Sequence, residues 1–235
     1  SLIIGKMYSS SDLAYYNQGK QFPNTIVNNI NSSIDSVLLP SMASAQDDRA
    51  RVKSMTRRSI KTSTYIMAPL MMGLAFCAKT IVQVVLTDKW LPCVPFLRIF
   101  CITYMFYPIH TANLNAIKAM GRSDYFLKLE IAKKIVGLGL LFSTMWFGVL
   151  AMAYSLLVNS VLSQIINSWP NRKLLNYGYL EQLKDILPGI SLAVFMGFCV
   201  SLTGLLHLSN GITLLIQIPF CLLYTSPSPR DISGS

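Results

Sequence analysis

The chain has 235 residues, of which 52% are apolar and only 13% charged, and its mean hydropathy is +0.47. Ordinary soluble domains carry about 25% charged residues, so this composition excludes a typical water-soluble protein and indicates a membrane protein. A net charge of +10 would suggest nucleic-acid binding in a soluble chain, and the positions of the cations decide between the two interpretations.

Apolar runs along the chain predict a series of membrane-spanning helices, because about 20 apolar residues are needed to cross a bilayer. Residues 1–6 resemble the end of a span that begins upstream. Seven spans are expected after it, with approximate bounds 13 or 22 to 44, 61–86, 91–117, the two halves of 135–168, 186–206 and 212–224. The predicted fold class is therefore all-α, a polytopic transmembrane helix bundle.

Prolines and one long uncharged stretch set the expected breaks in these helices. Pro69 is expected to kink its span, and Pro95 and Pro108 to interrupt the next one. The uncharged stretch 135–168 would make a helix of about 51 Å, which exceeds a hydrocarbon core of about 30 Å. A turn at residues 147–148 is therefore expected to divide it into two spans.

The first complete span carries a polar stripe. Its members recur every three or four positions, which places them within about 80° of arc on one helix face. They are Asn17, Lys20, Asn24, Asn28, Asn31 and Asp35. Because unpaired amides and charges that face lipid cost several kcal/mol, the stripe indicates a hydrophilic cavity, and hence a transporter. The alternative is that these side chains bond to neighbouring helices.

Polar residues within later spans are further candidates for the same cavity. Lys79 shares a predicted helix face with Gln83 and Tyr65, so its cation either faces the cavity or snorkels toward the outer surface. Arg98 has apolar neighbours on its own face, which favours snorkelling over substrate contact. His110 is expected to be a hydrogen-bonded packing residue, with a proton site as the alternative.

Cations cluster in alternate connections between the predicted spans. The three basic connections are 45–61, 118–134 and 170–184, whereas the intervening turns hold few cations apart from Lys6 and Lys89. This is the positive-inside pattern, which places the three basic connections in the cytoplasm. No aromatic interleaving suggests base stacking, so nucleic acid is not expected as a partner.

Catalytic and metal-binding motifs find little support in the sequence. Five dispersed cysteines lie mostly within apolar runs and are expected to be packing residues: Cys77, Cys93, Cys101, Cys199 and Cys221. No paired carboxylates converge, and no glycine-rich phosphate loop is present. The protein is therefore not expected to be an enzyme, and no cofactor or metal is expected.

Small residues recur every four positions in the span 186–206, at Gly189, Ala193, Gly197 and Ser201. This spacing suits the close approach of two helices within a bundle. A dimerisation face is the alternative.

Several segments, taken in order, resemble the C-terminal half of Wzx-type lipopolysaccharide and O-antigen flippases. The similar segments are 12–23, 29–33, 37–40 with the basic connection after it, 69–75, 86–92 with 95–97, and 115–124. Their order and spacing together are fairly specific, and the resemblance covers about residues 1–220.

The resemblance implies the C-terminal lobe of a two-lobe exporter of the multidrug/oligosaccharidyl-lipid/polysaccharide superfamily. By that analogy residues 1–169 hold the end of helix 7 and helices 8 to 12, and residues 170–224 hold two additional helices. Residues 225–235 are expected to be an artefactual or disordered tail. The first lobe is expected to precede this chain.

The function implied by the resemblance is the flipping of undecaprenyl-diphosphate-linked oligosaccharide across the bacterial inner membrane, for lipopolysaccharide or exopolysaccharide assembly. The lipid-linked substrate, membrane lipids and the polysaccharide assembly machinery would be its partners, and the coupling ion, H⁺ or Na⁺, is left open. In the stripe, amides would bond to sugar hydroxyls, Lys20 would face the phosphates, and Asp35 would pair with a cation or take part in ion coupling.

Two other functions remain as alternatives. A multidrug or cation exporter of the same superfamily would use a more apolar cavity with one or two carboxylates. A membrane-integral polysaccharide polymerase or ligase is less favoured, because it would be expected to carry a large external loop and every external connection here is short.

Overall fold

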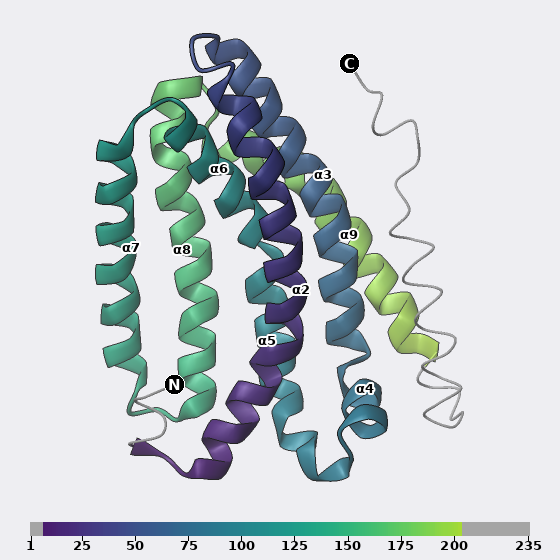
Figure 1. The fold of residues 1–235 in the computed structure, drawn as a ribbon. Helices are drawn as coiled ribbons and strands as arrows, with labels where there is room; N and C mark the ends of the chain where they lie inside the picture. The colour runs from purple at the N-terminus through teal and green to yellow at the C-terminus, as the bar shows by residue number, and fades with distance from the viewer. Residues whose placement is uncertain (1–6, 204–235) are drawn as a thin grey trace. The chain divides into compact units, whose positions relative to one another are not determined.

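The computed structural model describes residues 7–203, and every regular element within that range is a helix (Figure 1). The α-helices are α2 (Ser10–Ala43), α3 (Arg49–Phe76), α4 (Ala78–Val85), α5 (Val94–Met105), α6 (Tyr107–Ala119), α7 (Ser123–Thr144), α8 (Val149–Leu175) and α9 (Tyr179–Thr203). A 3₁₀-helix, η1 (Asp88–Cys93), precedes α5. The all-α prediction is confirmed. The predicted span at 212–224 and the tail at 225–235 lie outside the described residues.

The helices divide into two compact units. Unit 1 comprises the chain up to Asn24, residues Tyr65–Met105 and the chain from Pro188 onward. Unit 2 comprises Thr25–Thr64 and Phe106–Leu187. The boundaries fall within α2, α3 and α9, so each of these helices contributes residues to both units.

Three helical segments of residues 7–203 are long and apolar enough to cross a membrane: Asp88–Ala119, Val149–Leu175 and Tyr179–Val200. A fourth is obtained if α3 and α4, which meet at an angle of 66°, form one broken span. The sequence predicts spans in α2 and α7 as well, but neither helix is among the segments that are apolar enough to cross a membrane. The polar stripe makes α2 less apolar, and the first half of α7 carries several charged side chains.

Two expectations for the span at 61–86 are wrong. α3 begins at Arg49 rather than near Lys61, so the cations of the first basic connection lie on helix. Arg and Lys are good helix formers, which explains why the helix continues through them. α3 also continues through Pro69, and the bend falls at Cys77 instead. A proline removes one backbone donor, and a packed helix within a bundle tolerates that loss.

The other predicted breaks agree with the structure. α5 and α6 are separated at Phe106. Pro108 lies in the first turn of α6, where backbone N–H groups have no partner within the helix, so the lack of one costs little. Pro95 likewise lies at the start of α5. α7 and α8 are divided by a turn that ends at Gly148, whose φ of +99° favours glycine.

Aromatic contacts and one close backbone approach hold the centre of unit 1. The ring of Tyr16 on α2 makes edge-on contacts with the rings of Phe96 and Phe100 on α5, at centroid distances of 6.0 and 5.2 Å. A Cβ atom added at Gly19 would lie 2.7 Å from the Phe96 Cβ and 2.8 Å from the Leu97 backbone nitrogen. Glycine therefore lets α2 reach α5 at a distance that no other residue allows.

The repeat of small residues on α9 also serves packing in unit 1. Gly189, Ala193 and Gly197 are all buried. A Cβ atom added at Gly197 would overlap the Phe76 ring, so the glycine makes room for this ring of α3. The close-packing interpretation of this repeat is consistent with these contacts.

In unit 2, α7 and α8 run side by side in opposite directions, and α6 packs against α8 (Figure 1). The buried residues of α8 are largely polar: Ser155, Ser160, Ser163, Gln164, Asn167, Ser168 and Asn171. Unit 2 therefore has a more polar interior than the aromatic centre of unit 1.

Candidate functional site

The polar stripe of α2 lies on one helix, as the sequence predicts. Its exposed members are Asn17, Asn28 and Asp35, and its half-buried members are Lys20, Asn24 and Asn31. Val27, from the apolar side of the same helix, is only 1% exposed. Val37, also from the apolar side, is 68% exposed, so burial does not separate the two sides of α2 along its whole length. The role of the stripe in a substrate path stays a prediction.

Asp35 has an amide partner rather than a cation. The Asn115 side-chain nitrogen, on α6, donates a hydrogen bond of 2.6 Å to the Asp35 carboxylate. Asn115 is 2% exposed, so its amide needs a partner from the protein. This hydrogen bond uses one carboxylate oxygen, and the pairing of Asp35 with a cation or its part in ion coupling stays a prediction.

Lys79 and Gln83 lie on the short helix α4. Lys79 is exposed, and the Gln83 amide donates to the Asp88 carboxylate over 2.9 Å. The expectation that Lys79 shares a face with Tyr65 is wrong, because α4 leaves α3 at 66° and the helix is not continuous between these residues.

Arg98 contacts the end of α3. Its Nε donates to the Ala75 carbonyl oxygen over 3.2 Å. The last carbonyls of a helix have no partner in the following turn, and the break at Cys77 creates such an end here. One nitrogen of the guanidinium therefore serves a backbone group, and the preference for snorkelling over substrate contact stays a prediction.

His110 is a packing histidine held by two polar side chains of α8. Its Nε2 lies 3.4 Å from the Ser160 hydroxyl, and its Nδ1 lies 3.3 Å from the Asn167 amide nitrogen. Both ring nitrogens thus have a partner, which favours the hydrogen-bonded interpretation over a free proton site.

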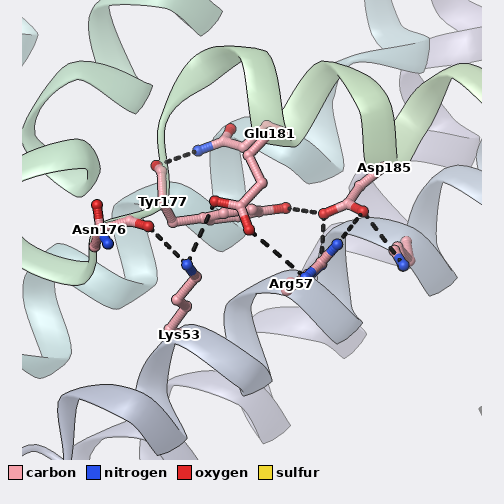
Figure 2. A network of polar contacts seen from close by, with 8 residues as sticks. Lys53, Arg57, Asn176, Tyr177, Glu181 and Asp185 are labelled. Carbon is pink, nitrogen blue, oxygen red and sulfur yellow. Dashed lines mark hydrogen bonds and ion pairs between the residues drawn. The ribbon is translucent and has the colours of Figure 1, made fainter. Parts of the chain in front are cut away.

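A charged cluster that sequence reasoning missed joins the first half of α3 to the start of α9 (Figure 2). We call it the charge network, and its members are Lys53, Arg57, Lys61, Tyr177, Glu181 and Asp185. All six belong to unit 2. Lys53 lies 3.4 Å from the Glu181 carboxylate and also donates to the Asn176 carbonyl oxygen over 2.7 Å.

Asp185 is the centre of the charge network. The Arg57 Nη2 donates to its Oδ1 over 2.9 Å, and the Arg57 Nε lies 2.7 Å from its Oδ2. The Lys61 Nζ lies 3.3 Å from Oδ1, and the Tyr177 hydroxyl donates to Oδ2 over 2.9 Å. Burial, together with the negative charge of Asp185, raises the pKa of Tyr177 well above its usual range, so the hydroxyl keeps the proton that it donates.

A second missed cluster, the amide cluster, consists of Asn113 on α6, Asn171 on α8 and Gln182 on α9. Asn113 and Gln182 exchange hydrogen bonds of 2.9 and 3.0 Å, and the Asn171 amide nitrogen donates to the Asn113 side-chain oxygen over 2.6 Å. All three side chains are completely buried. The Gln182 amide also donates to the Tyr177 carbonyl oxygen over 3.4 Å, which connects the amide cluster to the charge network.

Comparison with known proteins finds similarity to proteins of polysaccharide biosynthesis. Residues 1–95, which contain all of α2, match the family described as polysaccharide biosynthesis protein. The lipopolysaccharide biosynthesis protein WzxC of Escherichia coli (strain K12) is 24% identical over 59% of this chain and 28% of its own length. The resemblance to Wzx-type proteins is confirmed.

Two further relatives point the same way. A membrane protein in the cps region of Klebsiella pneumoniae is 27% identical over 59% of this chain and 29% of its own length. The teichuronic acid biosynthesis protein TuaB of Bacillus subtilis (strain 168) is 22% identical over 86% of this chain and 43% of its own length. The chain therefore spans less than half the length of each of these three relatives.

The fold has a solved counterpart. The lipid II flippase MurJ, in an inward closed conformation, matches with a TM-score of 0.75 at 18% identity. The match covers 97% of this chain and 49% of the MurJ chain. The chain is thus a membrane protein with the helical fold of one half of that structure.

The missed clusters did leave a signal in the sequence. Lys53, Arg57 and Lys61 recur every four residues, and so do Tyr177, Glu181 and Asp185. The three cations therefore occupy one face of α3, and Glu181 and Asp185 occupy one face of α9, with Tyr177 just before that helix. The positive-inside argument uses these cations only as markers of topology. All three basic connections fall within unit 2.

Proposed function

We propose that the intact protein flips a lipid-linked oligosaccharide across the bacterial inner membrane. The proposal is carried by the match of residues 1–95 to the polysaccharide biosynthesis family, since this segment contains the polar stripe. The names of the relatives support it: two belong to lipopolysaccharide and teichuronic acid biosynthesis, and MurJ is a lipid II flippase. The protein would act as a transporter rather than as an enzyme.

The stripe suits a substrate with a hydrophobic tail and a hydrophilic head. The tail can stay in the bilayer while the sugar-diphosphate headgroup crosses along hydrogen-bonding side chains. Asn17 and Asn28 are exposed and offer both donors and acceptors to sugar hydroxyls. Lys20 is half-buried and would offer a positive charge to the phosphates.

The expected orientation follows from the cations. The basic connections would lie in the cytoplasm, which puts the charge network on the side where a lipid-linked substrate is made. Membrane lipids and the polysaccharide assembly machinery would be further partners, and the undecaprenyl-diphosphate carrier follows from the Wzx-type resemblance. A coupling ion, H⁺ or Na⁺, would be supplied by the membrane gradient.

Deletion of the intact gene tests the proposal. The deletion strain should accumulate the lipid-linked oligosaccharide in the cytoplasmic leaflet, and an intact copy of the gene should remove that accumulation. The oligosaccharide is measured by radiolabelled sugar in extracted lipid, with leaflet assignment by an impermeant glycosidase on inverted and right-side-out vesicles. Unchanged amounts in both leaflets would refute flipping, and a selective gain in drug sensitivity would support the multidrug exporter instead.

A further inference from the structure

The first turns of α9 are attached to their neighbours by polar groups on two sides. Glu181 and Asp185 face the cations of α3, while Gln182, between them in sequence, bonds to the amide of Asn113 on α6. Asn171 on α8 joins the same amide group. Side chains therefore link residues 177–187 of unit 2 to α3 and α6, and the Tyr177 backbone N–H donates to the Asn171 carbonyl oxygen of α8 over 3.2 Å.

The members of the charge network differ in burial, and this decides which of them matter. The Asp185 side chain is 5% exposed, whereas that of Glu181 is 35% exposed. Exposed ion pairs contribute little, because water and salt screen them. A buried carboxylate is costly unless it is paired, so the loss of its partner is strongly destabilising. The contact between Arg57 and Asp185 should therefore dominate, and the contact between Lys53 and Glu181 should be the weaker one.

Polar contacts set the register of helices in a membrane bundle better than apolar contacts do. Apolar side chains gain little by leaving lipid for another helix, so a helix held by them alone can slide or rotate at small cost. A buried ion pair and an amide exchange are satisfied at one register only, and a one-residue shift would leave several of these groups without partners.

We propose that Arg57, Asp185 and Tyr177 are positioning residues that fix the register of α9 against α3. The amide cluster holds the same segment against α6 and α8, so the two clusters define one position for residues 177–187. We further infer that transport requires this register. That second step rests on the proposed function, whereas the register itself does not.

A charge exchange tests the register in the intact protein. Arg57→Asp and Asp185→Arg each place like charges together, and both single variants should lower the melting temperature of the detergent-purified protein. The double variant restores opposite charges between positions 57 and 185 and should recover part of the loss, since Lys61 and Tyr177 still lack their carboxylate partner. Arg58→Asp is the matched control, because Arg58 is the exposed neighbour of Arg57 on the same helix. A double variant as unstable as the singles, or a control as damaging as Arg57→Asp, would overturn the proposal.

Transport separates a positioning role from simple stabilisation. Clearance of lipid-linked oligosaccharide from the cytoplasmic leaflet, divided by the amount of folded protein in the membrane, should fall about tenfold or more in the single variants and recover in the double variant. Arg57→Lys keeps the charge but loses the fork of the guanidinium, and should show an intermediate rate. If all variants clear the lipid-linked oligosaccharide at the same rate per folded molecule, transport does not require this register.

Milder variants keep the test decisive if the charge reversals do not fold. Tyr177→Phe removes only the hydroxyl that donates to Asp185, and Glu181→Gln changes the exposed carboxylate. The register proposal predicts that Tyr177→Phe lowers the melting temperature more than Glu181→Gln does. The reverse order would contradict the proposal. The two proposals can fail separately. If the gene deletion causes no accumulation of lipid-linked oligosaccharide but the double variant still recovers stability, flipping is refuted and the register proposal is not.

Discussion

Unit 1 and unit 2 are stabilised by different kinds of contact. In unit 1, Tyr16 packs against phenylalanine rings, and Gly19 allows a close backbone approach. In unit 2, buried amides, serines and charged groups make hydrogen bonds to one another, as in the cluster around Asn113. The difference indicates that shape sets the packing of unit 1, whereas pairing of polar groups sets that of unit 2. Substitutions can therefore be designed to disturb one unit by volume and the other by loss of partners.

A large effect is expected from a single methyl group in unit 1. Gly19→Ala should destabilise the protein by about 1–3 kcal/mol, because the new Cβ would meet the backbone around Leu97 rather than a movable side chain. Gly139→Ala on α7 is the control, since nothing lies within 4 Å of the Cβ position there. Thermal unfolding of the detergent-purified protein measures both. Equal melting temperatures for the two variants would contradict the close approach.

The amide cluster gives the corresponding test in unit 2. Asn113→Leu keeps a similar volume but leaves Gln182 and Asn171 without their buried partner, and each such group costs about 1–3 kcal/mol. The exposed stripe residue Asn28 offers a matched control, because Asn28→Leu should change stability by at most about 0.5 kcal/mol. Melting temperatures distinguish the two. A stable Asn113→Leu protein would show that packing, not pairing, sets unit 2.

The stripe of α2 can be tested by chemical labelling in the intact protein. Single cysteines at Asn24, Asn28 and Asn31 should react with a water-soluble thiol reagent, fastest at the exposed position 28. A cysteine at Val27 should react slowly, because Val27 is 1% exposed. Labelling is read by mass shift in whole cells and vesicles. Uniform protection of the three stripe positions would favour helix packing over a hydrated path.

The smallest effect is expected from pH. The pKa of Tyr177 is raised in the folded protein from its ordinary value of 10.0, so its contribution to stability is complete below about pH 10 and is lost as the pH rises further. Between pH 7 and pH 9 the hydroxyl stays neutral in both states and adds no pH dependence. Tyr177→Phe should lack the loss above about pH 10. Identical pH profiles for both proteins would exclude this contribution.

The sequence predicts those features of the fold that depend on local spacing. The three- and four-residue spacing places the stripe on one face of α2, and the uncharged stretch requires the turn that ends at Gly148. Pro69 shows where a local rule fails, because surrounding helices let α3 continue through it. Four-residue spacing also reveals the two charged faces of the charge network. Their pairing joins residues 128 positions apart, as in Arg57 and Asp185, and spacing along the chain does not predict which faces meet.

The break between α3 and α4 leaves the last carbonyl groups of α3 next to a side chain from α5. α4 leaves α3 at 66°, and the Arg98 Nε donates to the Ala75 carbonyl oxygen just before the break. The guanidinium therefore supplies a donor where the bend interrupts the helical ladder. A polar residue that looks like a substrate contact in the sequence thus takes the place of a capping group at the end of α3.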